Sequence, residues 1–372
     1  MRLTIERATL LKTLNHVQSV VERRNTIPIL SNVLLSAKDG KLSLSSTDLE
    51  IEVIEEVDAE VSDPGATTAP AHMLYDIVRK LPEGSQLELE KGADESRLLV
   101  NAGKSKFTLQ SLPADDFPDL GSGDMSHKFK LGAAELKRLI DKTRFAISTE
   151  ETRYYLNGIY FHAAEQGSNP VLRAVATDGH RLAQVQYSLP DGAAGMPGVI
   201  IPRKAVLELH RLIEDEEGNI DISLSDSKIK FQLGSLVLTT KLIDGSFPDY
   251  TRVIPENNDK VLGVDAKAFT ASVDRVSTIT SEKGRAVKID IEASQIVLSV
   301  NNPESGSARE ELGVSYDGSS LEIGFNAKYL IDITSQIESD SAEFLFADAG
   351  SPTIIRASDD ETALYVLMPM RV

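Results

Sequence analysis

The 372-residue chain contains no cysteine and no tryptophan, and only 5% of its residues are aromatic. Without cysteine, disulfide bonds, cysteine-ligated zinc and thiol nucleophiles are excluded. The absence of disulfides suits a reducing compartment, and we expect a cytoplasmic protein. The few aromatic side chains do not alternate with basic residues, which argues against stacking platforms for single-stranded nucleic acid.

Long hydrophobic runs are also missing. No apolar segment approaches the roughly 18 residues of a membrane-spanning helix, and Glu6 and Lys12 interrupt the apolar pattern of the amino-terminal segment. We therefore expect no membrane span and no signal peptide. Helix-turn-helix and Cys/His finger spacings are absent, which argues against these sequence-reading DNA-binding motifs. The GxxxxGK[ST], HExxH and GxSxG patterns are absent too, and we expect no cofactor, no metal and no catalytic residue.

The net charge of −18 is unevenly distributed along the chain. The expected helical windows contain 19 lysines and arginines and 18 aspartates and glutamates. The rest of the chain contains 20 lysines and arginines and 39 aspartates and glutamates. Helices from several domains facing one polyanion would give sequence-independent, salt-sensitive contacts with phosphates. The alternative is that helix surfaces are simply rich in lysine and arginine. The windows are 6–24, 70–81, 133–153, 202–217, 265–285 and 326–340.

The chain repeats one pattern three times, and this repeat is its most informative feature. A strand runs into a proline or asparagine cap and then an amphipathic helix in TTAPAHMLYDIVRKL from residue 67, VIIPRKAVLELHRLI from 199 and IGFNAKYLIDITSQI from 323. Proline suits the first helical turn because its missing N–H has no partner there, and Asn326 can cap with its side chain. Three short strands follow each helix, and an earlier helix opens each copy.

The three copies predict an α+β fold of three repeated domains, each with two helices and antiparallel sheets. Turn-rich polar segments separate the copies, and we predict domains over residues 1–127, 128–254 and 255–372. In the third domain the opening helix is expected to begin after Asp265, which is a good N-cap residue.

One short stretch looks like the start of an active site. ATDGHRLA, residues 176–183, places Asp178, His180 and Arg181 within four positions. An acid–base pair of Asp178 and His180 would need a nucleophile or metal ligands, and the sequence offers no obvious ones. We therefore expect this stretch to bind something and predict no catalytic residue.

Paired acids in PADDFPDL (113–120) and DGSFPDY (244–250) could be interpreted as a metal site. They occur at the same place in two repeats, directly after a closing strand. Aspartate is common in turns because its side chain bonds its own backbone, so we interpret both segments as turns.

Several segments together resemble the bacterial DNA polymerase III beta subunit family, the replication sliding clamps. The similarity runs in order from NTIPIL (25–30) to Val372, and TDGHRL with the terminal MPMR is its most specific part. It implies three sliding-clamp domains and a head-to-tail, ring-shaped homodimer. It also implies a non-catalytic processivity factor of the replicative DNA polymerase, which encircles double-stranded DNA and slides without sequence specificity. The other similar segments are YYLNG (154–158), IPRKAVLEL (201–209), DGSFPDY and NNPE (301–304).

The resemblance also implies partners and residues. It implies a groove that binds linear motifs of the polymerase alpha subunit, the clamp loader, other polymerases and mismatch-repair proteins. Two flexible methionines would give this groove an adaptable apolar socket, and arginines would lie at its rim. The DNA contacts implied by the family are Arg24, Tyr154, Tyr155, Arg203 and Lys204. The groove residues are Leu156, Thr177, Gly179, His180, Arg181, Leu182, Pro248, Arg252, Val253, Val366, Met368, Pro369, Met370 and Arg371.

At the dimer interface, this sequence matches the family pattern less completely. Gly306 and Ser307 interrupt an otherwise acid-rich segment, and fewer charge pairs would make the ring easier to open, which is a hypothesis. Pro352 stands near the groove where a small polar residue is expected, which leaves partner preference open. The interface residues implied are Arg97, Lys106, Phe107 and Leu109 on one subunit, and Ile279, Glu304 and Glu310 on the other.

Three other functions stay open at the level of sequence. An enzyme using Asp178 and His180 would turn over a substrate. A scaffold built of repeats would never touch DNA, and a non-topological DNA-binding repair factor would hold linear and circular DNA equally well.

Overall fold

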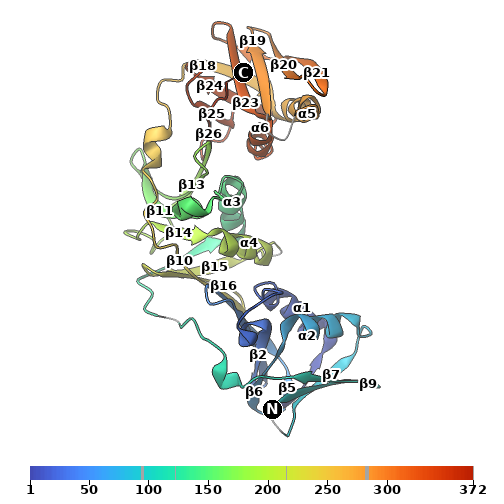
Figure 1. Cartoon of the computed structure of the whole chain (residues 1–372). Coiled ribbons are helices and arrows are strands. Elements are labelled where there is room, and N and C mark those ends of the chain that lie inside the picture. The colour runs from blue at the N-terminus through green and yellow to red at the C-terminus, as the bar shows by residue number, and fades with distance from the viewer. Residues whose placement is uncertain (94–95, 122, 215, 281–284, 372) are drawn as a thin grey trace. The chain divides into compact units, whose positions relative to one another are not determined.

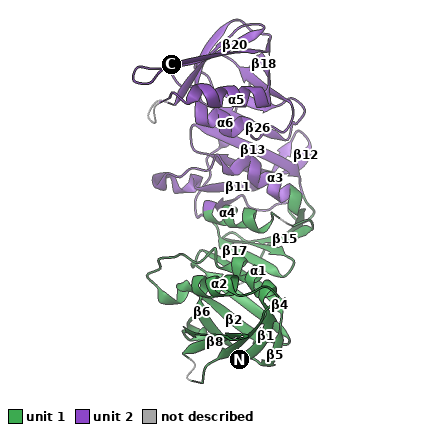
Figure 2. Ribbon diagram, turned by 90° about the vertical axis from the view of Figure 1, so that its right-hand side faces the viewer, with its two compact units in different colours: residues 1–134, 190–193, 204–242 green, residues 135–189, 194–203, 243–372 purple. Residues whose placement is uncertain are grey.

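The computed structural model describes residues 1–371 except 94–95, 122, 215 and 281–284. It contains two compact units (Figure 2). Unit 1 comprises residues 1–134, 190–193 and 204–242, and unit 2 comprises 135–189, 194–203 and 243–372. Both combine helices with antiparallel sheets, so the predicted α+β class is confirmed.

Unit 1 contains two sheets. The smaller has the strand order β5-β1-β7-β8-β9 and the larger the order β10-β15-β16-β17-β4-β3-β2-β6. Alternating burial in strands such as β3 reflects one face packed on the core. The strands are β1 (Arg2–Glu6), β2 (Asn32–Lys38), β3 (Lys41–Thr47), β4 (Ile51–Asp58), β5 (Glu60–Asp63), β6 (Gly65–Pro70), β7 (Gln86–Lys91), β8 (Arg97–Ala102), β9 (Ser105–Gln110), β10 (His127–Gly132), β15 (Asn219–Leu224), β16 (Lys228–Leu233) and β17 (Leu236–Lys241).

Helices α1 (Arg7–Val17) and α2 (Ala71–Lys80) lie side by side in unit 1 (Figure 1). Leu10, Leu14 and Val17 of α1 are fully buried because they recur at helical spacing on one face. Two 3₁₀ turns, η1 (Pro28–Ser31) and η2 (Ala114–Asp116), belong to this unit, and α4 (Arg203–Leu212) runs in it from its second residue onward.

Unit 2 repeats the arrangement with sheets ordered β14-β11-β12-β13-β26-β25-β24-β18-β22 and β21-β20-β19-β23. Its strands are β11 (Gly158–Gln166), β12 (Asn169–Thr177), β13 (Arg181–Ser188), β14 (Val199–Pro202), β18 (Lys260–Asp265), β19 (Ala286–Ile291), β20 (Gln295–Asn302), β21 (Gly306–Gly313), β22 (Ser315–Tyr316), β23 (Leu321–Asn326), β24 (Ser341–Phe346), β25 (Thr353–Ala357) and β26 (Ala363–Leu367).

The helices of unit 2 begin where the sequence predicts. Asp265 caps the next helix by accepting a hydrogen bond from the Ala268 N–H at 2.7 Å, and Asn326 accepts from the Lys328 N–H at 3.0 Å. Both capping predictions are confirmed. The helices and 3₁₀ turns are α3 (Ala133–Arg144, in this unit from its third residue), α5 (Ala266–Ser277), α6 (Ala327–Thr334), η3 (Glu151–Leu156) and η4 (Tyr250–Val253).

Each large sheet joins strands from two copies of the repeat. In unit 1, β4 pairs with β17 from Ile51–Thr240 to Glu55–Leu236. In unit 2, β13 pairs with β26 from Arg181–Leu367 to Val185–Ala363. The backbone ladder therefore continues from one repeat into the next within each unit.

The expected helical windows are longer than the helices. α1 ends at Val17, so Arg24 lies in the following loop and is exposed. The apolar pattern misled because Val20 and Val21 are buried from a turn, not from a helix. Residues 281–284 of the fifth window and residue 215 of the fourth lie outside the described residues.

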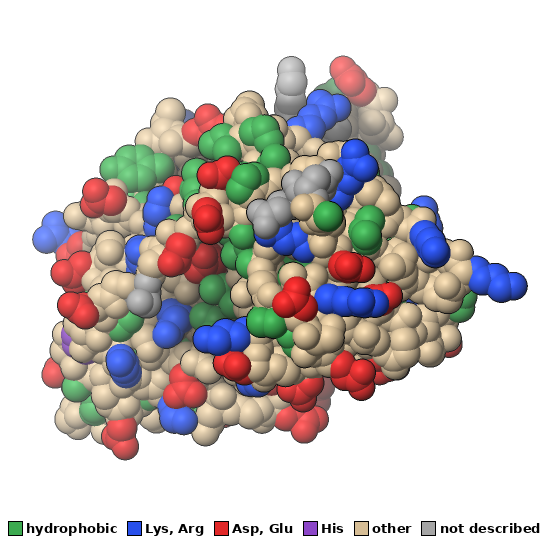
Figure 3. Space-filling model, turned by 90° about the horizontal axis from the view of Figure 1, so that it is seen from below, with side chains coloured by type: hydrophobic (Ala, Val, Ile, Leu, Met, Phe, Trp, Pro, Cys, Tyr) green, Lys and Arg blue, Asp and Glu red, His purple; other side chains and the backbone are tan. Residues whose placement is uncertain are grey.

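The paired acids lie in turns. Asp119 accepts a hydrogen bond from the Gly121 N–H at 2.6 Å, and Asp249 accepts from the Thr251 hydroxyl at 2.6 Å. Among the described residues, no group of three or more His, Asp or Glu side chains is placed to hold a metal ion. Figure 3 shows acidic and basic side chains interspersed over the face in view, without a field of one sign.

Candidate functional site

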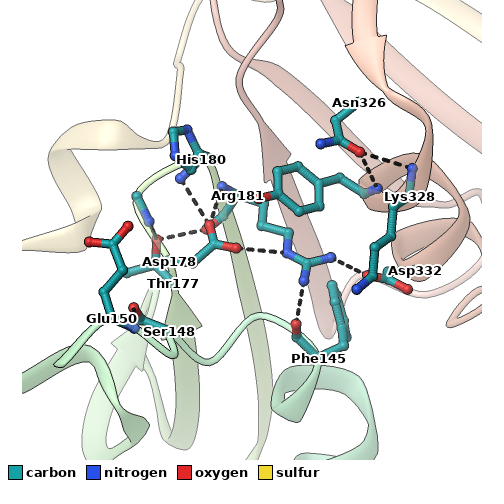
Figure 4. Close-up of polar contacts among 12 residues, drawn as sticks. Phe145, Ser148, Glu150, Thr177, Asp178, His180, Arg181, Asn326, Lys328 and Asp332 are labelled. Atoms are coloured by element: carbon teal, nitrogen blue, oxygen red, sulfur yellow. Dashed lines mark hydrogen bonds and ion pairs between the residues drawn. The ribbon is translucent and has the colours of Figure 1, made fainter. Parts of the chain in front are cut away.

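The centre of the stretch ATDGHRLA (176–183) forms the turn between β12 and β13. The Asp178 carboxylate accepts hydrogen bonds from the His180 and Arg181 N–H groups, at 2.9 and 3.0 Å (Figure 4). Thr177 closes the same turn by donating to the Arg181 carbonyl at 2.7 Å. Gly179 adopts φ +89°, a conformation that glycine reaches without strain. Asp178 thus binds backbone and does not pair with the His180 ring as an acid–base couple.

The same turn occurs in unit 1, between β3 and β4. Thr47 donates to the Ile51 carbonyl at 2.8 Å, and the Asp48 carboxylate accepts from the Ile51 N–H at 2.7 Å. Leu49 occupies the place of Gly179 with φ +77°. A non-glycine residue in this region is strained, so the turn geometry belongs to the repeat itself.

Arg181 is the most enclosed charged residue of this turn. Its side chain is 7% exposed, and its guanidinium lies 4.2 Å from the centre of the Tyr329 ring and 5.1 Å from that of Phe145. Nε donates to Asp178 at 3.1 Å, one Nη to Asp332 at 2.6 Å and the other to the Phe145 carbonyl at 2.6 Å (Figure 4).

This geometry gives Arg181 a structural role in the turn. All three guanidinium nitrogens donate inside the protein, and aromatic rings lie against the cation. Arg181 also lines the neighbouring cavity, so its predicted contact with a ligand stays a prediction.

Ten of the fourteen predicted groove residues line one cavity of about 270 Å³ in unit 2. Leu182, Tyr250 and Val366 line its floor, and they pack with Val175 in one buried cluster. Exposed apolar side chains stand at its mouth, with Val253 49% and Met368 41% accessible. The ten residues are Leu156, Thr177, Gly179, His180, Arg181, Leu182, Pro248, Val253, Val366 and Met368.

Four predicted groove residues do not line this cavity. After Met368 the chain turns to β23, where the Met370 N–H donates to the Gly324 carbonyl at 2.8 Å. This pairing carries Pro369, Met370 and Arg371 away. Arg252 is bound to Asp249 at 2.9 Å, and its side chain is 83% exposed. The sequence pattern could not show where the terminal segment leaves the groove.

The cavity also has walls that the sequence prediction missed. Arg153, Asp249 and Tyr250 line it, as does Tyr155, which was assigned to DNA. Tyr155, Asp249 and Tyr250 lie within two positions of a predicted groove residue, so adjacency along the chain was the available signal for them. Arg153 lies three positions before Leu156. Arg153 has φ −111° and ψ 51°, outside helical values, and it is held by Glu150 at 2.8 Å. The hydrogen bond from Arg153 lowers the pKa of the Glu150 carboxyl.

The residues assigned to DNA occupy different environments. Arg203 is exposed at the start of α4, and Tyr154 is 53% exposed with its ring 5.7 Å from that of Tyr155, edge on. Lys204 is different, since it donates to Glu22 at 3.0 Å and also to Asp48. Burial lowers the pKa of Lys204, but the bonds to these carboxylates outweigh it, and the net shift is upward.

The predicted interface residues lie on or beside the edge strands of two sheets. Lys106, Phe107 and Leu109 are on β9, the edge strand of the smaller sheet of unit 1, and Arg97 is on the neighbouring β8. In unit 2, β21 is an edge strand of its sheet. Ile279 and Glu304 flank this sheet, and the Ile279 carbonyl accepts from Asn302 at 2.8 Å.

Glu310, on β21, has partners within its own chain. It accepts from the Ser272 hydroxyl at 2.7 Å and from Arg275 Nε at 3.1 Å. The bonds from Arg275 and then Ser272 lower the pKa of this carboxyl. The charge of the Glu310 carboxylate is therefore already compensated within its own chain.

Pro352 precedes β25 and is absent from the cavity wall. Its carbonyl accepts a hydrogen bond from the Asn258 amide at 2.9 Å.

Within the described part of the chain, no helix is long and apolar enough to cross a membrane.

Comparisons with known proteins cover nearly the whole chain. Residues 1–121, 130–249 and 251–371 match the N-terminal, central and C-terminal domain models of the DNA polymerase III beta subunit. The predicted boundaries at 127 and 254 stay predictions, because the compact units divide the chain differently.

Relatives and solved structures agree with these matches. The chain is 55% identical to the beta sliding clamp of Caulobacter vibrioides and 40% identical to that of Escherichia coli, with all of each protein covered. It resembles a Bartonella birtlesii sliding clamp solved with griselimycin (TM-score 0.97, 53% identity, 100% of both chains). A Caulobacter crescentus clamp is similar too (TM-score 0.98, 55% identity, covering 100% of this chain and 99% of that one). The chain belongs to the DNA polymerase III beta subunit family, the non-catalytic sliding clamps that make the replicative polymerase processive.

Proposed function

We propose that the cavity of unit 2 is the groove through which this chain binds linear motifs. The partners are the replicative polymerase alpha subunit, the clamp loader, other polymerases and mismatch-repair proteins. The observation that carries this proposal is the convergence of ten predicted groove residues on one apolar cavity. A cavity of this kind with a few polar groups at its edge is a typical binding site.

The chemistry of the wall suits several partners. Leu182 and Val366 form a rigid apolar floor, whereas Met368 is flexible and exposed at the mouth. Methionine adapts its shape to different ligands, which is a property of promiscuous binding surfaces. We infer that apolar side chains of the partner enter the cavity and that His180 and Arg153 contact its backbone.

Two copies of the chain form the working assembly in this proposal. Edge strands present unpaired backbone groups to a second chain, and β9 and β21 are such edges. Pairing β9 of one copy with β21 of the other, head to tail at both ends, would close a ring. The resulting ring encircles duplex DNA, and Arg24, Arg203 and Tyr154 contact the phosphate backbone without reading sequence. Replication takes place on chromosomal DNA, so we propose a cytoplasmic location.

The hypothesis of an easily opened ring fits the environment of Glu310. Because Arg275 of the same chain binds this acid, it contributes little to pairing between chains. We expect the dimer to dissociate faster than those of acid-rich relatives at matched salt. Equal or slower dissociation would count against the hypothesis.

Retention on DNA tests the ring. The protein is loaded on nicked circular plasmid with its clamp loader and ATP, and the bound fraction is measured before and after the plasmid is cut. Loss on cutting supports encirclement. Equal retention on the linear form would favour a non-topological DNA-binding scaffold or repair factor.

A binding assay tests the groove separately. A short, fluorescein-labelled peptide with leucine and phenylalanine side chains and capped ends is titrated with the full-length protein. Anisotropy should rise to saturation, and unlabelled peptide should reverse it. No binding would remove the docking proposal while leaving the ring untouched.

A further inference from the structure

The rear wall of the groove is tied to a buried histidine. Tyr250 lines the cavity, is 5% exposed, and packs with Leu182 and Val366 in the buried cluster of its floor. Its hydroxyl lies 3.1 Å from Nε2 of His162 and 3.0 Å from Nη1 of Arg173. The Tyr250 side chain therefore connects the groove to two residues that do not line it.

The directions of these hydrogen bonds follow from the partners. Nδ1 of His162 lies 3.0 Å from the Ala163 carbonyl, which only accepts, so Nδ1 carries the proton. In the neutral ring Nε2 is then an acceptor, and the Tyr250 hydroxyl donates to it. Arginine has no acceptor, so Arg173 donates to the Tyr250 oxygen. The hydroxyl is satisfied on both sides only while His162 is neutral.

Aromatic packing fixes the same group of residues. The Tyr160 ring stacks on His162 at 4.4 Å and on Phe247 at 4.9 Å between centroids. Arg173 is 9% exposed and also donates to the Gln186 side chain at 2.9 Å. The imidazole thus has little room to turn away if its hydrogen bonding changes.

We propose that His162 and Arg173 are positioning residues of the groove: they hold Tyr250 from behind, and protonation of His162 withdraws this support and weakens peptide binding. The proposal rests on the docking function proposed above. A protonated Nε2 would donate toward an oxygen that already accepts from Arg173. The Tyr250 proton would then lose its acceptor, and two cations would share one hydroxyl.

The surroundings of His162 favour the neutral ring. Burial is the main cause that lowers its pKa, the Arg173 charge lowers it further, and the bond to Ala163 opposes both. The folded protein therefore binds this proton less readily than the unfolded chain, whose pKa is near 6.5. The stabilisation is complete above that value and is lost as pH falls toward the lower pKa of the folded state.

The other titratable groups in contact with the imidazole come from three elements. They are Tyr160 from β11, Tyr250 from η4 and, through the Tyr250 hydroxyl, Arg173 from β12. Burial raises the pKa of Tyr160, so this phenol stays protonated over the range. At the groove itself, hydrogen bonds lower the pKa of the Asp249 and Glu150 carboxyls, which stay ionised.

The chain offers a matched control. Of its six histidines, only His162 and His180 belong to unit 2, and His180 is exposed in the groove wall. Either one could produce a loss of affinity in acid. Replacing each separately assigns the effect.

The experiment is the anisotropy titration with the same capped Leu/Phe peptide, carrying a rhodamine dye whose charge and emission do not change over this range in place of fluorescein, between about pH 7.5 and about pH 5. The full-length protein should bind about threefold or more weakly at the acid end, because the competent fraction sets the apparent affinity. His162→Gln, whose amide oxygen accepts from Tyr250 at every pH, should bind as the parent does at neutral pH and lose the pH dependence. Tyr250→Phe should also lose it, with uniformly weaker binding.

Three results would overturn the inference. These are a parent affinity independent of pH, a His162→Gln protein that keeps the acid loss, and a His180→Gln protein in which the loss disappears. Circular dichroism at each pH separates loss of binding from unfolding, and Tyr250→Phe decides if His162→Gln does not fold. Absence of peptide binding at every pH would instead count against the groove itself.

Discussion

Arg181 on β13 donates to Asp332 on α6 at 2.6 Å, and this contact joins the central and C-terminal family domains inside unit 2. The guanidinium is buried, so removing it leaves Asp178 and Asp332 without their cation. We expect Arg181→Met to lower the free energy of unfolding of unit 2 by about 3–5 kcal/mol. Urea denaturation followed by circular dichroism measures this. A loss below about 1 kcal/mol would show that Arg181 is not the support described here.

Gly179 and Leu49 occupy the same place in two copies of one turn. Gly179→Ala places a methyl group 2.5 Å from Arg153 Nη1 and puts a side chain at φ +89°. We expect a loss of about 1–2 kcal/mol in stability. Weaker peptide binding should accompany it, because Arg153 must move in the groove wall.

Leu49→Gly should have the opposite effect on stability. Its φ of +77° is strained for leucine, and glycine relieves that strain at the expense of a more flexible unfolded chain. The net gain should be about 0.5 kcal/mol, read from the urea midpoint. A destabilised Leu49→Gly protein would mean that the exposed leucine side chain makes a contact that outweighs the strain.

Met368 and Met370 form a matched pair for the groove. Both are exposed, at 41% and 38%, but only Met368 lines the cavity. Met368→Ala should weaken peptide binding about tenfold through lost apolar contact. Met370→Ala should leave it nearly unchanged. Equal losses in the two anisotropy titrations would mean that the bound peptide extends along the terminal segment.

Arg203 and Lys204 are neighbours that should differ on DNA. Arg203 is exposed, whereas Lys204 is held by Glu22 and Asp48. Arg203→Ala should reduce the slope of log affinity against log salt by about 1, as expected for one phosphate contact. Lys204→Ala should change it less. Fluorescence binding to a short duplex over a salt series measures both, and the reverse order would reassign the contact.

The sequence predicted elements well and side-chain partners poorly. The repeat located the helices and the three strands that follow the capped helix in each copy, because apolar spacing and capping residues act locally. Arg181 shows the limit: its charge suggested a rim, but its partners Asp332 and Tyr329 lie about 150 residues further along the chain. Nothing local reveals that a cation will be enclosed.

The family resemblance supplied most, but not all, of the predicted groove residues that line the cavity. The resemblance supplied Leu182 and Val366, which the structure brings into one cluster. It also included Met370 and Arg371, which leave the cavity because a single bridge to Gly324 redirects the chain. His162 carried no signal in the sequence, since the role proposed for it depends on a tyrosine 88 positions away.

The strand pairs β4–β17 and β13–β26 make each repeat incomplete by itself. A fragment cut at the predicted boundary after residue 127 would leave β4 without its neighbour, and its exposed ladder groups would invite aggregation. In the remaining fragment, β17 would lose its partner strand β4. The smallest piece that can be expressed with both large sheets intact is therefore not a repeat, and truncation studies of this protein need boundaries that follow strand pairing, not sequence similarity.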